Sequence, residues 1–271
     1  MENNTKNLTY LYCVAKRVPK LKKVEKLVAN LSFVYRCDSY AVISKVSREE
    51  FGKENLKKNL ADLEWVKAKA YIHEKVIEGI MKFGCVIPFK FATLFYSDHS
   101  LKLFLEEHAQ MFRENLDRVE GKEEWGVKIY CNREKLSANC PKEDKNLLKI
   151  DEEINTVSAG KAYLLKKKKE VLLNAIVSKE IAECGQNSFN RLSEQSLQTR
   201  VNQVLPKEVT ERMDDMILNV ALLLDKNKVD GFIQAVGALK TEYNDKGFNI
   251  DCTGPWPPYN FCTLGGKKIE K

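Results

Sequence analysis

The sequence predicts an α+β fold, an α/β sandwich of two domains in which antiparallel sheets pack against helices. Its 271 residues suffice for two domains at about 100–200 residues each. Hydrophobic residues make up 44% and charged residues 31%, a composition typical of a soluble globular protein with its own cores. Short strand-like segments alternate with longer segments of helical periodicity. The longest apolar run, residues 216–224, is far shorter than the roughly 20 residues that span a bilayer, so we expect no membrane partner.

Residues 1–121 are the predicted N-terminal α/β domain. In order, the pattern predicts strands over 8–15 and 40–46, a helix over about 55–83, a strand-like segment over 85–95 and a helix from Ser97 or Asp98 to Gly121. A lysine-rich connection joins the first two strands. Pro88 divides the segment 85–95, which favours an edge strand or a bend because proline has no amide proton for a ladder.

Residues 122–253 are the predicted C-terminal domain, and their order of elements is ferredoxin-like. The pattern predicts strands near 123–131, 201–205 (weak), 216–224 and 248–252, and helices over about 159–183 and 228–246. Trp125 begins an alternation typical of a half-buried strand. Strand, helix, strand, strand, helix, strand is the split βαβ order, with helices on one face of an antiparallel sheet. Residues 132–157 are polar, and we expect an irregular insertion there.

Residues 254–271 are the predicted C-terminal tail, which contains the stretch GPWPPYNF. Its prolines hold φ near −65° and remove backbone donors, so we expect the last strand to stop before them and a stiff, extended arm to follow. The candidate partner-binding or tail-docking residues are Gly254, Pro255, Trp256, Pro257, Pro258, Tyr259 and Phe261. Two interpretations remain open. Trp256 and Tyr259 fold back and seal the base of the second domain, or the arm contacts another protein.

The residues that usually carry catalysis form no recognisable site. His73 and His108 lie among apolar residues at helical spacing, which favours buried structural side chains, and His99 is expected to be exposed. No phosphate-binding glycine loop or nucleophile elbow occurs. The acid pairs 123–124 and 214–215 are expected to be solvated. The sequence therefore predicts no enzyme and no cofactor.

Cysteines and lysines do not indicate a ligand either. The eight cysteines are scattered, which favours reduced thiols in the cytoplasm. Cys131 and Cys140 are close in sequence but lack the other ligands of a metal site. The net charge of +7 is mild, and the lysine run 166–169 lies in a helical segment flanked by acids, where a solvated face is expected.

Four separated motifs together carry a family resemblance. They are GPWPPYNF at the tail, GKEEWGVKIYC at 121–131, SAGKAYLLKKK at 158–168, and Trp65 eight residues before His73 and ahead of VIPFKFATLF at 86–95. The residues of these motifs outside the tail are Trp65, His73, Pro88, Phe89, Gly121, Trp125 and Gly160. The chain resembles the gas vesicle protein GvpL/GvpF family over nearly its whole length. Asn260 stands where Ser or His is common in the family, and Ala92 stands where Gly or Cys is common. The branch stays open, with VKIYC leaning towards GvpL.

The resemblance implies a non-enzymatic protein with a two-domain, partly ferredoxin-like fold. It implies an accessory or minor structural protein of gas vesicle assembly that binds the hydrophobic main shell protein GvpA and other accessory proteins. It also implies a location at the gas vesicle, inside the cell. We hypothesise that residues 255–261 contribute to a shell-protein contact or hold the surface that does. The alternative is a nucleic-acid-binding module that uses the ferredoxin-like sheet and the basic surface, and a small-molecule enzyme is third.

Overall fold

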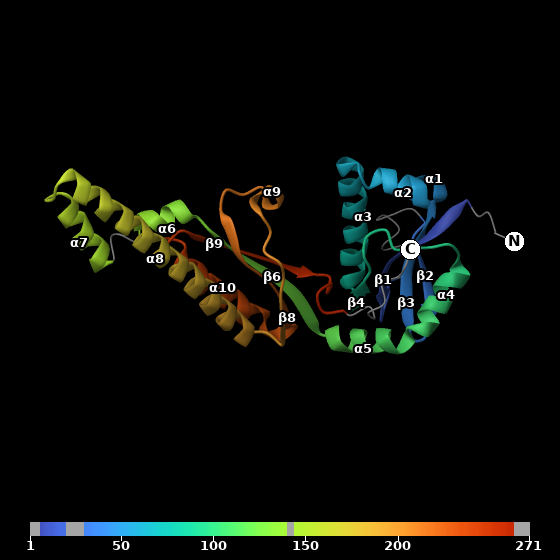
Figure 1. Ribbon diagram of the computed structural model, residues 1–271. Helices are drawn as coiled ribbons and strands as arrows, with labels where there is room; N and C mark the ends of the chain where they lie inside the picture. The colour runs from blue at the N-terminus through green and yellow to red at the C-terminus, as the bar shows by residue number, and fades with distance from the viewer. Residues whose placement is uncertain (1–5, 20–29, 140–143, 263–271) are drawn as a thin grey trace. The chain divides into compact units, whose positions relative to one another are not determined.

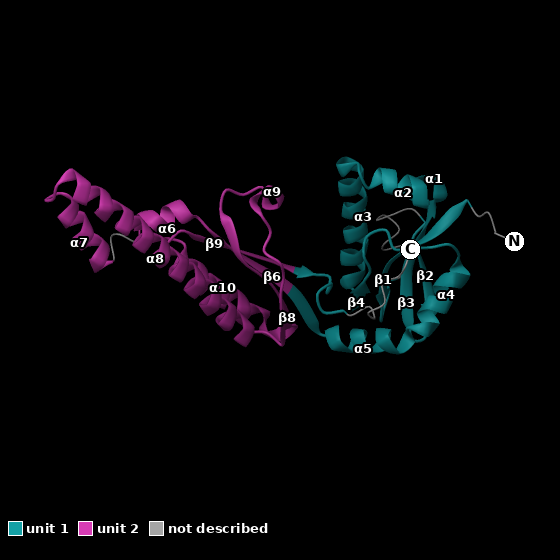
Figure 2. Ribbon diagram, in the orientation of Figure 1, with its two compact units in different colours: residues 1–124, 255–271 teal, residues 125–254 magenta. Residues whose placement is uncertain are grey.

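Two separate parts of the sequence build the first of the chain's two units. The computed structural model describes residues 6–19, 30–139 and 144–262. Unit 1 comprises residues 1–124 and 255–271, and unit 2 comprises residues 125–254 (Figure 2). The domain boundaries predicted from the sequence lie instead after residues 121 and 253. Part of the predicted tail, residues 263–271, and Cys140 lie outside the described residues.

The sheet of unit 1 has the order β2-β3-β1-β4, and β5 also pairs with β1 (Figure 1). Its strands are β1 (Asn7–Ala15), β2 (Ser32–Arg36), β3 (Ser39–Ser47), β4 (Val86–Pro88) and β5 (Leu94–Phe95). All of these pairings are antiparallel. Pro88 ends the edge strand β4, as its missing amide proton predicts.

Helices cover both faces of this sheet, because β1 is apolar on both sides. The helices are α1 (Arg48–Phe51), α2 (Lys53–Asn59), α3 (Leu63–Met81), α4 (Asp98–Glu107) and α5 (Ala109–Val119). Tyr10 and Tyr12 of β1 share one core with Val76, Ile77 and Ile80 of α3. Leu11 and Val14 share the other core with the buried residues of α4 and α5, which are Leu101, Leu105, Phe112 and Leu116.

Three details of unit 1 differ from the sequence-based expectation. The helix predicted over 55–83 is two helices, because the Asp62 carboxylate accepts from the amides of Glu64 and Trp65 and starts α3 anew. The helix predicted from 97 to 121 is also divided, at His108. The lysine-rich connection contains β2, which turns into β3 through Cys37 and Asp38 at φ 47° and 60°. Such turns usually carry Asn-Gly, so the hairpin is hidden in the sequence.

Unit 2 is ferredoxin-like, as predicted. Its strands are β6 (Lys122–Cys131), β7 (Gln198–Val201), β8 (Asp215–Asp225) and β9 (Phe248–Trp256), in the sheet order β7-β8-β6-β9. The connecting helices are α6 (Arg133–Asn139), α7 (Lys145–Ile154), α8 (Ala159–Glu194), α9 (Lys207–Thr210) and α10 (Val229–Tyr243), with a short 3-10 helix at Lys226–Lys228. Alternate residues of β6 and β8 pack in one core with α8 and α10, and the ring of Trp125 lies 6.1 Å from that of Phe232. The α+β fold class is confirmed.

The prediction of an irregular segment over 132–157 is wrong. Its described residues contain the helices α6 and α7. Asp144 caps α7 by accepting from the amides of Asn146 and Leu147, and Leu147 and Ile150 are buried. Two apolar side chains one turn apart are enough to bury one face of so short a helix, although the segment as a whole is polar.

The expectation that the last strand stops before the prolines is also wrong. Strand β9 continues through Gly254 and Pro255 to Trp256. A proline is compatible with extended backbone where its nitrogen does not face a ladder partner, so Pro255 does not end the strand.

Two glycine substitutions should have opposite effects. Gly247 has φ 107°, and an added Cβ would lie 3.1 Å from the Leu136 nitrogen and 3.2 Å from the Asn132 oxygen. We expect Gly247→Ala to lower the free energy of unfolding by more than about 1 kcal/mol. Gly185→Ala, inside α8 where an added Cβ meets no atom within 4 Å, should raise it by up to about 1 kcal/mol. Urea unfolding followed by circular dichroism measures both, and equal effects would contradict the positive φ and close contacts at Gly247.

Candidate functional site

The docked tail, residues 255–262, packs on unit 1 and buries two of its three prolines rather than its largest rings. Pro257, Pro258 and Phe261 are buried, whereas Trp256 is 42% exposed and Tyr259 is 37% exposed. A turn forms this shape, because the amides of Phe261 and Cys262 donate to the Pro258 oxygen at 3.2 and 3.1 Å. One of the two sequence-based interpretations placed the rings at the base of the second domain. The structure places the segment in unit 1 and leaves both rings partly open to solvent.

A buried carboxylate holds the docked tail at Asn260. Glu124 is 4% exposed. Its Oε2 accepts from the Asn260 backbone amide at 3.0 Å, and its Oε1 accepts from Asn260 Nδ2 at 2.6 Å. Burial raises the pKa of Glu124, and the two Asn260 hydrogen bonds oppose that shift. Arg118 Nη1 donates to the Phe261 oxygen at 3.3 Å and ties the next residue down.

His73 lies at the centre of a buried hydrogen-bond chain. Its Nε2 is 3.0 Å from the Phe89 oxygen, and its Nδ1 is 2.9 Å from the Tyr10 hydroxyl. A carbonyl oxygen can only accept, so Nε2 carries the ring proton and Nδ1 accepts from Tyr10. The Tyr10 oxygen in turn accepts from the Ala92 amide at 2.9 Å. Burial lowers the pKa of His73 to about 4, so the ring is neutral at pH 7.

The docked tail joins this hydrogen-bond chain through Tyr259. Its hydroxyl donates to Glu74 Oε1 at 2.8 Å and lies 3.3 Å from His73 Nε2. Burial raises the pKa of both Tyr259 and Glu74, and the adjacent carboxylate raises that of Tyr259 further. Tyr259 is therefore a neutral donor that links the tail to helix α3.

The motif residues of unit 1 lie around the hydrogen-bond chain of His73. Trp65 donates from Nε1 to Glu50 at 2.9 Å, and its ring lies 6.1 Å from that of Phe91. Phe89 is buried, and its amide donates to the Tyr12 oxygen beside Pro88. Ala92 has φ 59°, a left-handed conformation that glycine adopts most easily.

The other motif residues lie elsewhere. Gly121, with φ 73°, forms the turn into β6. Trp125 packs in the core of unit 2, and Gly160 is the second residue of α8. Gly254 is exposed in β9 with φ 152°.

Sequence reasoning missed Glu74 and Glu124 as tail contacts. Glu124 was expected to be solvated, because a pair of acids near a turn usually is. That expectation is wrong, since Asn260 covers its carboxylate. No local pattern reveals a partner that lies 136 residues away.

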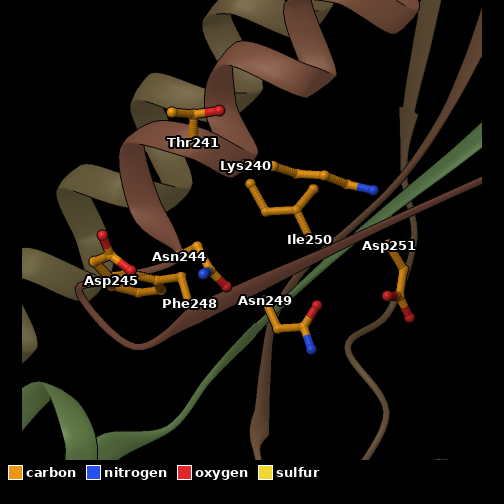
Figure 3. A pocket seen from close by; sticks show the side chains of 8 residues that line it. All are labelled: Lys240, Thr241, Asn244, Asp245, Phe248, Asn249, Ile250 and Asp251. Atoms are coloured by element: carbon orange, nitrogen blue, oxygen red, sulfur yellow. The ribbon is translucent and has the colours of Figure 1, made fainter.

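The side chains that line a hollow beside the C-terminal end of α10 do not converge on one point, as a ligand site would require (Figure 3). The hollow is lined by Lys240, Thr241, Asn244, Asp245, Phe248, Asn249, Ile250 and Asp251. Figure 3 shows Asn249 and Asp251 apart from each other on β9 and Asp245 on the turn before it, and their side chains do not point toward one another. Asp251 is already bound by Arg212 at 2.6 Å.

The described part of the chain shows neither a metal cluster nor a membrane span. No three His, Cys, Asp or Glu side chains within the ranges 6–19, 30–139 and 144–262 are grouped to hold a metal ion. In the same ranges, every helix is too short or too polar to traverse a bilayer.

Comparison with known families decides the identity. A family model described as gas vesicle synthesis protein GvpL/GvpF matches residues 8–263. The chain belongs to the GvpL/GvpF family. The resemblance carried by the four sequence motifs is thereby confirmed.

Relatives of the GvpL/GvpF family match along most of the chain. It is 25% identical over 243 residues to gas vesicle protein L of Streptomyces sp. (strain CB03234), covering 86% of this chain and 84% of that protein. It is 25% identical over 279 aligned positions to gas vesicle protein L1 of Halobacterium salinarum, covering 98% of this chain and 94% of that protein. The crystal structure of GvpF from Anabaena sp. PCC7120 has the same fold, with a TM-score of 0.67 at 16% identity, covering 98% of this chain and 100% of that one.

The neutral His73 predicts a stability loss in acid. The unfolded chain takes up the histidine proton near pH 6.5, whereas the folded chain resists it until about pH 4. His73 therefore contributes stability above pH 6.5 that is lost as the pH falls towards 4, by up to about 3 kcal/mol. Glu74 and Glu124, whose pKa values are raised, act in the opposite direction, so the informative quantity is the difference between native chain and variant.

Urea unfolding between pH 4 and 7 tests this with His73→Gln, which cannot titrate there. The variant should be less stable than the native chain at pH 7, and the gap should narrow as the pH falls. His99→Gln removes an exposed histidine of the same unit and is the matched control. A gap that stays constant with pH would contradict a neutral His73.

Asn260→Ala should release the docked tail while the rest of unit 1 stays folded. It removes one of two donors to a buried carboxylate, a loss of about 1.5–3 kcal/mol for a charged hydrogen bond. Amide hydrogen exchange of residues 259–262 should become roughly 10–100 times faster. Asn249→Ala, an exposed asparagine in β9, is the control. Unchanged exchange in the Asn260 variant would show that the Asn260 side chain is not what holds the segment.

Proposed function

We propose that this chain is an accessory or minor structural protein of gas vesicle assembly that binds the main shell protein GvpA and other accessory gas vesicle proteins. The observation that carries the proposal is the family match over residues 8–263. The proposed location is the gas vesicle within the cell. The similar proteins are named gas vesicle protein L and L1, and the similar solved structure is a GvpF, which supports a role in the same process.

The docked tail supplies the surface for the proposed GvpA contact. A hydrophobic subunit exposes apolar surface until it polymerises, and such surface aggregates unless a partner covers it. Trp256 and Tyr259 stand 42% and 37% exposed on a base formed by buried Pro257, Pro258 and Phe261. Aromatic rings that are held in place cost little entropy on binding, which is why they dominate protein interfaces.

Contacts within unit 1 favour a binding role over catalysis. His73 has both ring nitrogens engaged, and Glu74 and Glu124 each accept from the docked tail. These side chains position a segment of the chain and leave no group aimed at a substrate. We therefore propose a non-enzymatic protein without a cofactor.

The outer face of the unit 2 sheet gives little support to the nucleic-acid alternative. Proteins of that kind stack bases on open aromatic rings of the sheet. Here the guanidinium of Arg212 lies 4.1 Å from the centre of the Tyr130 ring and pairs with Asp251. Tyr130 is 4% exposed and offers no platform.

Trp256→Ala combined with Tyr259→Ala tests the shell-protein contact. We expect co-purification with GvpA to fall by about tenfold or more, because two large apolar rings leave the interface. Gas vesicle formation in a host that lacks the native chain should fall with it. Tyr71→Ala, which removes a 64% exposed tyrosine from α3, is the matched control.

Tyr259→Phe separates docking from contact, since it keeps the ring and removes the hydroxyl that donates to Glu74. Deleting residues 254–271 is a less clean test, because it also uncovers Glu124. If the double variant keeps its circular dichroism and still binds GvpA and supports vesicles, the docked tail is not the contact.

A further inference from the structure

Helix α8 has a solvent-facing side that the fold of unit 2 does not use. The C-terminal half of the 36-residue helix packs into the core through Val177, Cys184, Ser188 and Leu192. Its N-terminal half lies beside α7 (Figure 1), where Leu147 is buried and Lys169 bonds Asp151 at 2.6 Å. Packing on α7 accounts for one side of this half and leaves the opposite side open.

The open side carries an apolar line at helical spacing. Gly160, Leu164, Val171 and Ala175 follow one another at intervals of four, seven and four residues, which places them on one face. All four are exposed, Leu164 by 66% and Val171 by 71%. Single exposed aliphatics are common, but Leu164 and Val171 lie on one helical face with small residues at either end, which gives a continuous apolar surface.

Small residues at both ends of the line leave room for another backbone. A Cβ added at Gly160 would meet no atom within 4 Å. Gly160 lies in the first turn of α8, where its missing side chain leaves open space beside the helix. Close approach by a second helix would make use of the missing side chain.

Lysines border the apolar line on both sides. Lys161 and Lys168 lie along one side and Lys167 along the other, and all three are exposed. Lys167 also lies 5.7 Å from the centre of the exposed Tyr163 ring. Among residues 160–175 the acid is Glu170, which lies about 120° around the helix from Leu164. The surface is thus apolar at its centre and positive at its flanks.

We propose that the face of α8 formed by Gly160, Leu164, Val171 and Ala175, with Lys161, Lys167 and Lys168, binds an amphipathic helix of a partner protein whose flanks are acidic. Apolar side chains seven residues apart fit the repeat of a second helix, and charges beside such a line select a partner of opposite sign. The line is narrow and lacks the broad aliphatic and aromatic face of a helix that lies in a lipid surface. The site is in unit 2 and does not involve the docked tail, so it stands apart from the proposed GvpA contact.

The probe is a fluorescent synthetic helix of about five turns with leucines on one face and glutamates beside them, titrated with the full chain by anisotropy. A matched peptide carries lysines in place of the glutamates. We expect the acidic peptide to bind and the basic one not to bind. Lys161→Glu, Lys167→Glu and Lys168→Glu together should weaken the acidic peptide about tenfold or more and allow the basic peptide to bind. Leu164→Ala with Val171→Ala should also weaken binding of the acidic peptide, because two apolar side chains leave the contact.

The control has the same change of charge on exposed lysines outside the line, at Lys145, Lys149 and Lys166. Circular dichroism checks that every variant is folded. An equal loss in the control, no effect of the Leu164 and Val171 substitutions, or no binding of the acidic peptide at about 1 mM would overturn the proposal. Binding to phosphatidylglycerol vesicles that the same substitutions abolish, with no peptide binding, would replace it by a lipid surface.

Discussion

Unit 1 depends on the hydrogen-bond chain that passes through His73. The chain joins the sheet at Tyr10, helix α3 at His73 and the loop between β4 and β5 at Phe89 and Ala92. Because the Phe89 oxygen can only accept, the proton must reside on Nε2, and the Tyr10 hydroxyl must point at Nδ1. Buried polar atoms are costly when unpaired, so this arrangement holds three elements in one relative position.

The docked tail packs on these elements, yet part of its own aromatic surface stays exposed. Asn260 satisfies the Glu124 carboxylate, and Phe261 is buried while Arg118, near the end of α5, binds its backbone oxygen. These contacts fix the backbone on either side of Tyr259 while its ring stays 37% exposed. A segment that is held firmly and still shows aromatic surface is suited to recognition, because little further ordering is needed when a partner arrives.

Local patterns predicted what local forces determine. The ferredoxin-like order of unit 2 follows from alternation in β6 and β8 and from helical spacing in α8 and α10. Helical spacing likewise predicted a buried His73. The docking of the tail depends instead on hydrogen bonds between residues that are separated by 136 and 185 positions in the sequence. A single sequence holds no signal for such contacts. Helix α7 was missed because one capping carboxylate and two buried side chains stabilise it within a polar segment.

The discontinuous make-up of unit 1 has a consequence for biosynthesis. Residues 255–262 are translated after every residue of unit 2, so a nascent chain carries unit 1 without its cover while unit 2 emerges from the ribosome. During that interval Glu124 has no Asn260 and His73 has no Tyr259 beside it. The partly exposed rings of the docked tail can therefore reach their final place only once both units have been made. A chain that stalls within unit 2 never presents them.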